Sequence, residues 1–93
     1  MKATLKSRVI AESDDIIEVD GYLYFPRSAV RMDWLAKAEK TADDLECPHG
    51  VQFYDVVVDG ERHERAAWSY EAPRASMARV AQRVGFWEDV EVA

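Results

Sequence analysis

The residues best suited to chemistry lie together in one short stretch, Cys47-Pro48-His49-Gly50. Cys47 is the only cysteine of the chain, and His49 is one of its two histidines. A thiolate beside an imidazole can act as a nucleophile with its base, or the two groups can supply part of a metal site. Pro48 and Gly50 favour a turn instead, because proline lacks an amide donor and glycine tolerates unusual backbone angles. We therefore interpret the stretch as a turn that leads into a strand, beside a shallow pocket.

A metal site in this chain is short of ligands. Structural zinc takes four ligands, usually including several cysteines, and the chain offers only Cys47, His49 and His63. His63 lies among charged residues, where we expect it to be exposed to solvent. The sequence therefore predicts no metal, and we expect no other cofactor.

Catalysis by Cys47 would require neighbouring groups that the sequence does not reveal. The thiolate needs a cationic partner, and a third group must orient the imidazole of His49. Pro48 restricts the backbone between the two side chains, so their contact is not assured. A small, partly buried thiol at a turn is the alternative that we favour.

The pattern of apolar residues predicts a mainly β fold. Two strand-like runs, 51–58 and 62–70, flank Asp59-Gly60, which is the strongest short-range signal for a hairpin. Lys6-Ser7 and Asp20-Gly21 offer two further tight turns. Shorter runs of strand character occupy residues 2–6, 8–12, 15–19, 22–25 and 86–92. We expect a compact antiparallel β domain.

Two short helices are expected, near 28–38 and 74–84. Ser28 can cap the first helix, and the apolar residues that follow it recur at helical spacing. Apolar residues from Met77 onward show the same spacing in the second, and Gly85 can end that helix in a left-handed conformation. The polar segment 37–46 lacks an apolar period, and we interpret it as a solvated loop.

Length and charge restrict the class of protein. A chain of 93 residues forms one domain, 1–93, with one core. Its 18 acidic and 12 basic residues give a net charge of −6, which disfavours binding to nucleic acid. We see neither a signal peptide nor 18 consecutive apolar residues, so we expect no membrane span. A single cysteine cannot form an internal disulfide, which fits a cytoplasmic protein.

Several short motifs occur in a recognisable order along the chain. They are "RVIAES", "YFP", a lone "CP.G" after a charged segment, "VDG", "AAWSY..P" and a terminal "FW..VEV". In this order they resemble small single-domain members of the domain-of-unknown-function family 427, which also carries a nucleotidyltransferase-like name. The resemblance covers nearly the whole chain. It implies a compact antiparallel β fold of tent-like (Mss4-like) topology, and it implies no established activity.

The chain departs from this family pattern at the cysteine. Family members usually read Thr-x-Cys-Pro-x-Lys-Gly, whereas Leu45 replaces the threonine here and the lysine has no clear counterpart. An anion-binding role of that lysine is therefore not carried over. Nucleotidyl transfer would also need carboxylates for Mg²⁺ and a loop for phosphates. The pairs Asp14-Asp15 and Asp43-Asp44 look like solvated charges, and no Gly-rich phosphate loop is present.

Aromatic strand residues suggest where a pocket would lie. Tyrosine and tryptophan combine an apolar body with a polar group, so a subset of them near Cys47 and His49 could line a pocket for a small polar ligand. Packing in the core alone is the other explanation, and we expect it for Trp68 in particular. The pocket candidates are Tyr24, Cys47, His49, Tyr54, Trp68 and Tyr70.

Our leading hypothesis for the function is a non-catalytic binding module for a small molecule or a protein partner. The alternative is a small enzyme, either thiol-based or, as the family name suggests, a nucleotidyltransferase. A homodimer is left open, and neither nucleic acid nor a membrane is expected as a partner. The distance between Cys47 and His49 and the reactivity of the thiol distinguish the two hypotheses.

Overall fold

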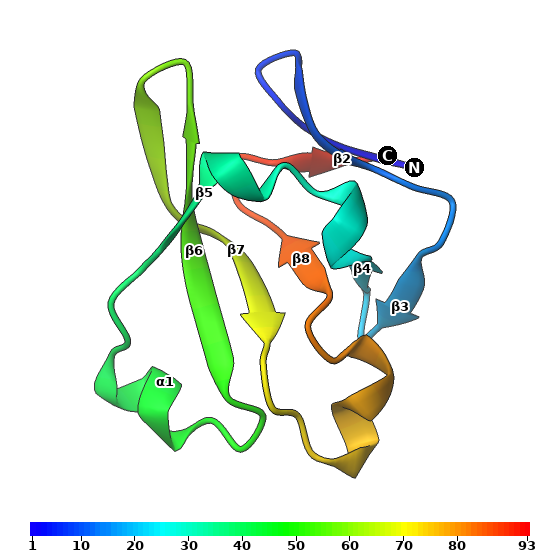
Figure 1. The fold of residues 1–93 in the computed structure, drawn as a ribbon, viewed down its shortest axis with the longest axis vertical. Coiled ribbons are helices and arrows are strands. Elements are labelled where there is room, and N and C mark those ends of the chain that lie inside the picture. The colour runs from blue at the N-terminus through cyan, green and yellow to red at the C-terminus, as the bar shows by residue number, and fades with distance from the viewer.

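Nine strands in two antiparallel sheets form the framework of the molecule. The computed structural model describes residues 1–93, and Figure 1 shows the arrangement. The smaller sheet has the order β2-β1-β9, with β1 at Lys2–Leu5, β2 at Arg8–Glu12 and β9 at Glu91–Val92. The larger sheet has the order β3-β4-β8-β7-β6-β5. Its strands are β3 (Ile17–Val19), β4 (Tyr22–Phe25), β5 (Leu35–Lys37), β6 (Val51–Val58), β7 (Glu61–Tyr70) and β8 (Val84–Phe86). The mainly β class is confirmed.

Three hairpin tips are formed as the sequence predicts. Both residues of Lys6-Ser7, Asp20-Gly21 and Asp59-Gly60 have positive φ, with 52° and 81° in the last pair. Positive φ at both central positions defines a type I′ turn, whose twist matches that of the flanking strands. The long hairpin of β6 and β7 runs along the long axis of the molecule (Figure 1), and it pairs with β5 on one side and with β8 on the other.

The helix expected near 28–38 is wrong in its extent. Two single 3₁₀ turns, η1 (Arg27–Ala29) and η2 (Met32–Trp34), precede the strand β5, and Ser28 lies inside η1 without capping it. The backbone finds better partners outside the segment: the amide of Arg31 donates to the carbonyl of Ile10 at 2.8 Å, and β5 pairs with β6. Sheet pairing thus overrides a modest local helical preference.

The loop expected over 37–46 is also wrong in part, because it contains the only α-helix, α1 (Ala42–Glu46). Thr41 and Asp44 form a reciprocal capping box: the amide of Asp44 donates to Thr41 Oγ1 at 3.2 Å, and the amide of Thr41 donates to Asp44 Oδ2 at 3.0 Å. A threonine followed three residues later by an acid is a helix-start signal that the lack of an apolar period obscured. Asp44 is buried, so it is not a solvated charge.

The helical segment expected near 74–84 is present as the 3₁₀ helix η3 (Ala75–Val80). Gln82, with φ at 58°, takes the left-handed conformation that we expected at Gly85. Gly85 lies instead in the middle of β8, and the expected last strand over 86–92 is divided between β8 and β9. None of the helices is long and apolar enough to span a bilayer.

The larger sheet buries side chains on both faces. Its inner face shares a core of 14 residues with the smaller sheet, and Phe25, Val56 and Val84 belong to it. Its outer face carries a second, smaller cluster, built on Tyr24, Val51, Trp68 and Val80. Alternation along β7 separates the two: Ala67 points inward and Trp68 outward.

Gly85 makes room for the indole of Trp68, its partner across the strands. A Cβ atom at Gly85 would lie 2.7 Å and 2.9 Å from Trp68 ring atoms, closer than such atoms approach. The indole therefore lies flat against the backbone of β8. This contact explains why residue 85 is a glycine; a positive φ angle is not the reason.

We predict that Gly85→Ala destabilises the protein by about 1–3 kcal/mol, because the new methyl group must displace the indole or the strand. Urea denaturation followed by circular dichroism measures the change. The same substitution in a Trp68→Leu background should cost clearly less, because the clashing ring is gone. Equal costs in the two backgrounds would show that the contact with Trp68 is not the reason for the glycine.

Candidate functional site

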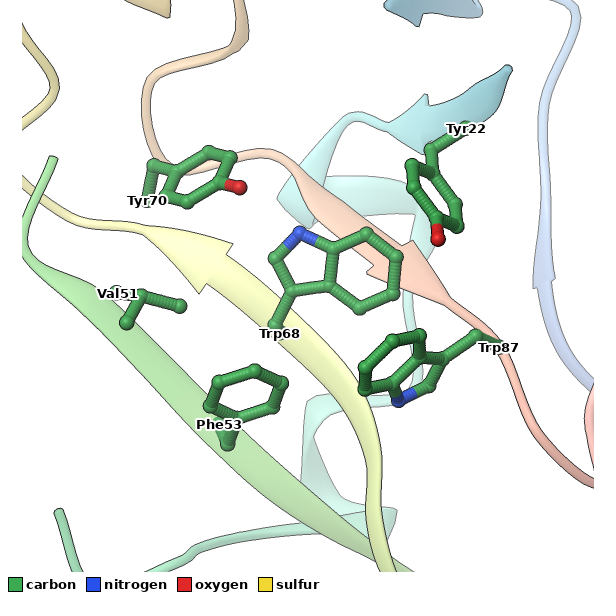
Figure 2. Close-up of a pocket in the computed structure, with 6 residues that line it drawn as sticks. All are labelled: Tyr22, Val51, Phe53, Trp68, Tyr70 and Trp87. Carbon is green, nitrogen blue, oxygen red and sulfur yellow. The ribbon is translucent and has the colours of Figure 1, made fainter. Parts of the chain in front are cut away.

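A pocket of about 110 Å³ opens on the outer face of the larger sheet. Figure 2 shows the side chains that line it. They come from β4, β6, β7 and the segment that follows β8, and alternation along each strand brings them to the same face. All six are aromatic or aliphatic, namely Tyr22, Val51, Phe53, Trp68, Tyr70 and Trp87.

Trp68 forms the centre of the pocket and is only 5% exposed. The ring of Tyr22 lies 5.1 Å from it, centroid to centroid, at an interplanar angle of 88°. The ring of Trp87 lies 5.2 Å from it at 62°, and Tyr22 and Trp87 are 6.4 Å apart at 77°. Three aromatic rings thus meet at steep angles to one another.

Phe53 lies beside Trp87 and contacts a cation. Its ring stacks near that of Trp87, at 6.0 Å and 26°. The guanidinium of Arg65 lies 3.9 Å from the centroid of Phe53, and the indole N–H of Trp87 donates to the backbone carbonyl of Arg65. Arg65 therefore holds two members of the pocket at once.

Arg65 owes its position to a bulge in β7, where Glu64, Arg65 and Ala66 together oppose the single residue Asp55 of β6. Arg65 has φ at 54°, which is uncommon for a residue with a long side chain. Its amide donates to Asp55 Oδ1 at 3.0 Å. Its guanidinium donates twice to the buried carboxylate of Asp44, at 3.0 Å and 2.8 Å. These bonds compensate for the unfavourable backbone conformation.

Two of the predicted pocket residues, Trp68 and Tyr70, line this pocket. Tyr24 lies beneath them in the same cluster, with its ring 5.9 Å from Trp68 and 6.3 Å from Tyr70. Burial raises the pKa of Tyr24 to about 12. Burial also raises the pKa of Tyr70. Both hydroxyls therefore stay protonated near neutral pH.

Cys47 and His49 lie at the Tyr70 end of the same cluster, but they are not coupled. Cys47 packs against the cluster, and the ring of His49 lies 5.4 Å from that of Tyr70. His49 Nδ1 accepts a hydrogen bond from the amide of Arg74 at 3.0 Å, and no hydrogen bond joins the thiol to the imidazole. The carbonyl of Cys47 accepts from the amide of Gly50 at 3.3 Å, which confirms the turn.

Tyr54 lies on the other face of the sheet, apart from the other five candidates. Its side chain belongs to the inner core, and its hydroxyl donates to Glu71 Oε1 at 3.2 Å. Arg27 joins this polar group through Ser69 and Glu71, each at 2.9 Å. The structure therefore brings five of the six candidates together and separates Tyr54 from them.

His63 is not exposed as we expected. Its side chain is 12% exposed, with Nδ1 2.9 Å from Asp89 and Nε2 3.6 Å from Glu61. Asp89, in the segment after Trp87, lies against His63, and the charged sequence around His63 does not reveal this contact. No group of three or more His, Cys, Asp or Glu side chains has an arrangement that could hold a metal ion.

Four residues of the pocket escaped the sequence analysis: Tyr22, Val51, Phe53 and Trp87. The hairpin register places Phe53 on the correct face but gives it the wrong neighbour. Counting back from Asp59-Gly60 without a bulge pairs Phe53 with Ala66, whereas the bulge shifts the pairing by two residues and sets Phe53 opposite Trp68. A shift of two residues preserves the face and changes the neighbour.

One family model matches the chain over residues 1–93, and its description is a domain of unknown function, DUF427, under the name NTP_transf_9. The chain belongs to the DUF427 family. This confirms the resemblance seen in the sequence motifs. None of the curated proteins compared with this DUF427 chain matches it. The tent-like topology that the resemblance implies stays a prediction.

We predict that Asp44→Asn lowers the free energy of unfolding at pH 7 by on the order of 1–3 kcal/mol, because Arg65 loses its charged acceptor. The hydrogen bonds from Arg65 hold the pKa of Asp44 below its usual value, so the folded state favours the ionised form. The contribution of the pair is complete above about pH 5 and is lost as the pH falls through that depressed pKa. Urea denaturation between pH 7 and pH 3 measures it.

Asp43→Asn is the matched control, because Asp43 is the neighbouring carboxylate of α1 and is exposed. It should leave stability nearly unchanged at every pH. A gap between wild type and Asp44→Asn that stays constant down to pH 3 would contradict the assignment of this effect to the ion pair.

Proposed function

We propose that this DUF427 chain is a non-catalytic binding module that holds an apolar group of a small molecule in the aromatic pocket. The observation that carries the proposal is the convergence of five aromatic rings around one hollow. Tyr22 remains 40% exposed there, and Phe53, Tyr70 and Trp87 are only partly buried. Exposed aromatic side chains gathered around a concavity are typical of binding sites.

The rigidity of the pocket supports this proposal. Trp68 is fixed against Gly85, and Arg65 holds Phe53 and Trp87 from behind. A site that is already formed loses little conformational entropy when a ligand binds, which favours affinity from a small contact area. The small volume suits one compact group of a ligand rather than a long segment of a protein partner.

Binding without catalysis fits the chemistry of the lining. No acid, base or nucleophile lines the pocket, and the tyrosine hydroxyls of Tyr24 and Tyr70 have raised pKa values. For the thiol-based alternative, His49 and Cys47 would have to be coupled, and His49 Nδ1 is engaged by Arg74 instead. For nucleotidyl transfer, Asp44 would have to be free for Mg²⁺, and it is paired with Arg65. We propose a cytoplasmic location on the evidence of the lone, unpaired Cys47.

A titration with indole and phenol as neutral probes tests the proposal. The indole N–H signals of Trp68 and Trp87 in a ¹H–¹⁵N spectrum should shift in a saturable manner, with a dissociation constant of roughly 1 mM or below, about −4 kcal/mol. The third tryptophan, Trp34, lies against the inner core and serves as an internal control. Its signal should stay in place.

Tyr22→Ala should weaken binding of these probes at least several-fold, since it removes an exposed wall of the pocket. Val9→Ala is the matched control, because Val9 is 39% exposed and belongs to the smaller sheet. Shifts that never saturate, or that affect Trp34 as much as Trp68, would argue against a binding pocket at this place.

A further inference from the structure

Three of the rings that line the pocket meet in one corner at steep angles to one another. Tyr22, Trp68 and Trp87 are inclined to one another by 88°, 77° and 62°, and their centroids lie 5.1–6.4 Å apart. A flat ligand ring stacks on only one such face. A compact, rounded group can contact all three rings at once.

Electrostatics favour a cation in this corner. The face of each ring carries negative potential, so several rings inclined around one point attract positive charge. Asp20 precedes Tyr22 in the β3–β4 turn, and Glu88 follows Trp87 directly. Both carboxylates are exposed, and neither forms an ion pair within the chain.

The charge of Asp20 contributes to the raised pKa of the pocket tyrosine, Tyr70. Burial raises the pKa of Tyr70 most, and the negative charge of Asp20 adds to the rise. No cation of the chain stacks on the rings of Tyr22, Trp68 or Trp87. Arg65 is neutralised by Asp44, and Arg74 is attached through its amide to His49 at the Tyr70 end of the pocket.

The chain already stacks cations on its rings at two places. Arg65 lies over Phe53 at 3.9 Å, at the back of this pocket, and Arg31 lies over Trp34 at 4.2 Å. The aromatic corner offers the same interaction, with more rings and no cation from the chain in place. The net charge of the whole chain, −6, adds a general attraction for positive ligands.

We infer that the corner formed by Tyr22, Trp68 and Trp87 binds a methylated ammonium group of a small molecule, with Asp20 and Glu88 as the neighbouring negative charges. Such a group is rounded, is weakly hydrated and carries its charge under methyl groups, so it suits rings better than hydrogen-bonding side chains. This inference rests on the proposed binding function and names the ligand class for the same pocket.

Choline and 3,3-dimethyl-1-butanol provide the test, because they have the same shape and differ in the charge at one atom. Both are titrated at constant ionic strength while the indole N–H signals of Trp68, Trp87 and Trp34 are recorded. We expect choline to bind at least about 5-fold more tightly than the neutral alcohol, the advantage that a cation gains over several rings. The signal of Trp34 should not move.

Substitutions test whether the preference for choline arises in this corner of the pocket. Tyr22→Leu should abolish the preference for choline, and its partial exposure means that the fold survives the change. The double variant Asp20→Asn, Glu88→Gln should weaken choline several-fold and leave the neutral alcohol unaffected. Glu91→Gln, an exposed carboxylate on the smaller sheet, is the control and should change neither.

Each outcome decides between the two proposals. Equal affinity for choline and the neutral alcohol would overturn the ammonium inference and leave the binding pocket in place. Binding of indole or phenol without binding of choline would have the same meaning. If neither these probes nor choline shifts the signals of Trp68 and Trp87, both the inference and the proposed function fail.

Discussion

The structure of the site depends on the unusual backbone of Arg65. This residue is held with positive φ at a bulge where three residues of β7 face Asp55 of β6. Such a conformation costs of the order of 1 kcal/mol or more for a residue other than glycine. Its amide bond to Asp55, its paired bonds to Asp44 and its carbonyl bond to Trp87 offset that cost. Four parts of the chain, α1, β6, β7 and the segment after β8, meet at this one residue.

The bulge also explains why the outer face carries a pocket instead of a flat layer. By shifting the register two residues, it sets Phe53 opposite Trp68, so two large rings share the same level of the sheet. Trp68 can lie there only because Gly85 has no side chain beneath it. Trp87 then completes the group from the end of β8. The concave aromatic surface thus depends on the bulge at Arg65 and on the absence of a side chain at Gly85.

The two faces of the larger sheet have different roles. The inner face builds the core with the smaller sheet and ends in a polar group, where Arg27 binds Ser69 and Glu71 and Tyr54 joins them. Every polar atom of that group has a partner, so it closes the core instead of offering a site. The outer face leaves Tyr22 exposed and Phe53, Tyr70 and Trp87 only partly buried. This asymmetry is the reason that we propose ligand binding on the outer face.

The sequence by itself determined the parts of the structure that short-range physics controls. Asp59-Gly60 and the other turns predicted the hairpins, because turn conformation depends on residues that are near neighbours in the chain. The helix expected at 28–38 failed, since its backbone pairs with strands that are distant along the chain.

Only the tertiary structure decided the site. The pairing of Asp44 with Arg65 joins positions 21 residues apart, and the local capping pattern of Thr41 and Asp44 does not identify Arg65 as the partner. The bulge at Arg65 is invisible to a count from the turn, so the partner of Trp68 could not be predicted. Which rings would meet depends on register and on contacts between distant segments. Alternation along a strand determines which face of the sheet a residue occupies, but it does not determine which residues lie beside it. The packing of the whole chain determines those neighbours.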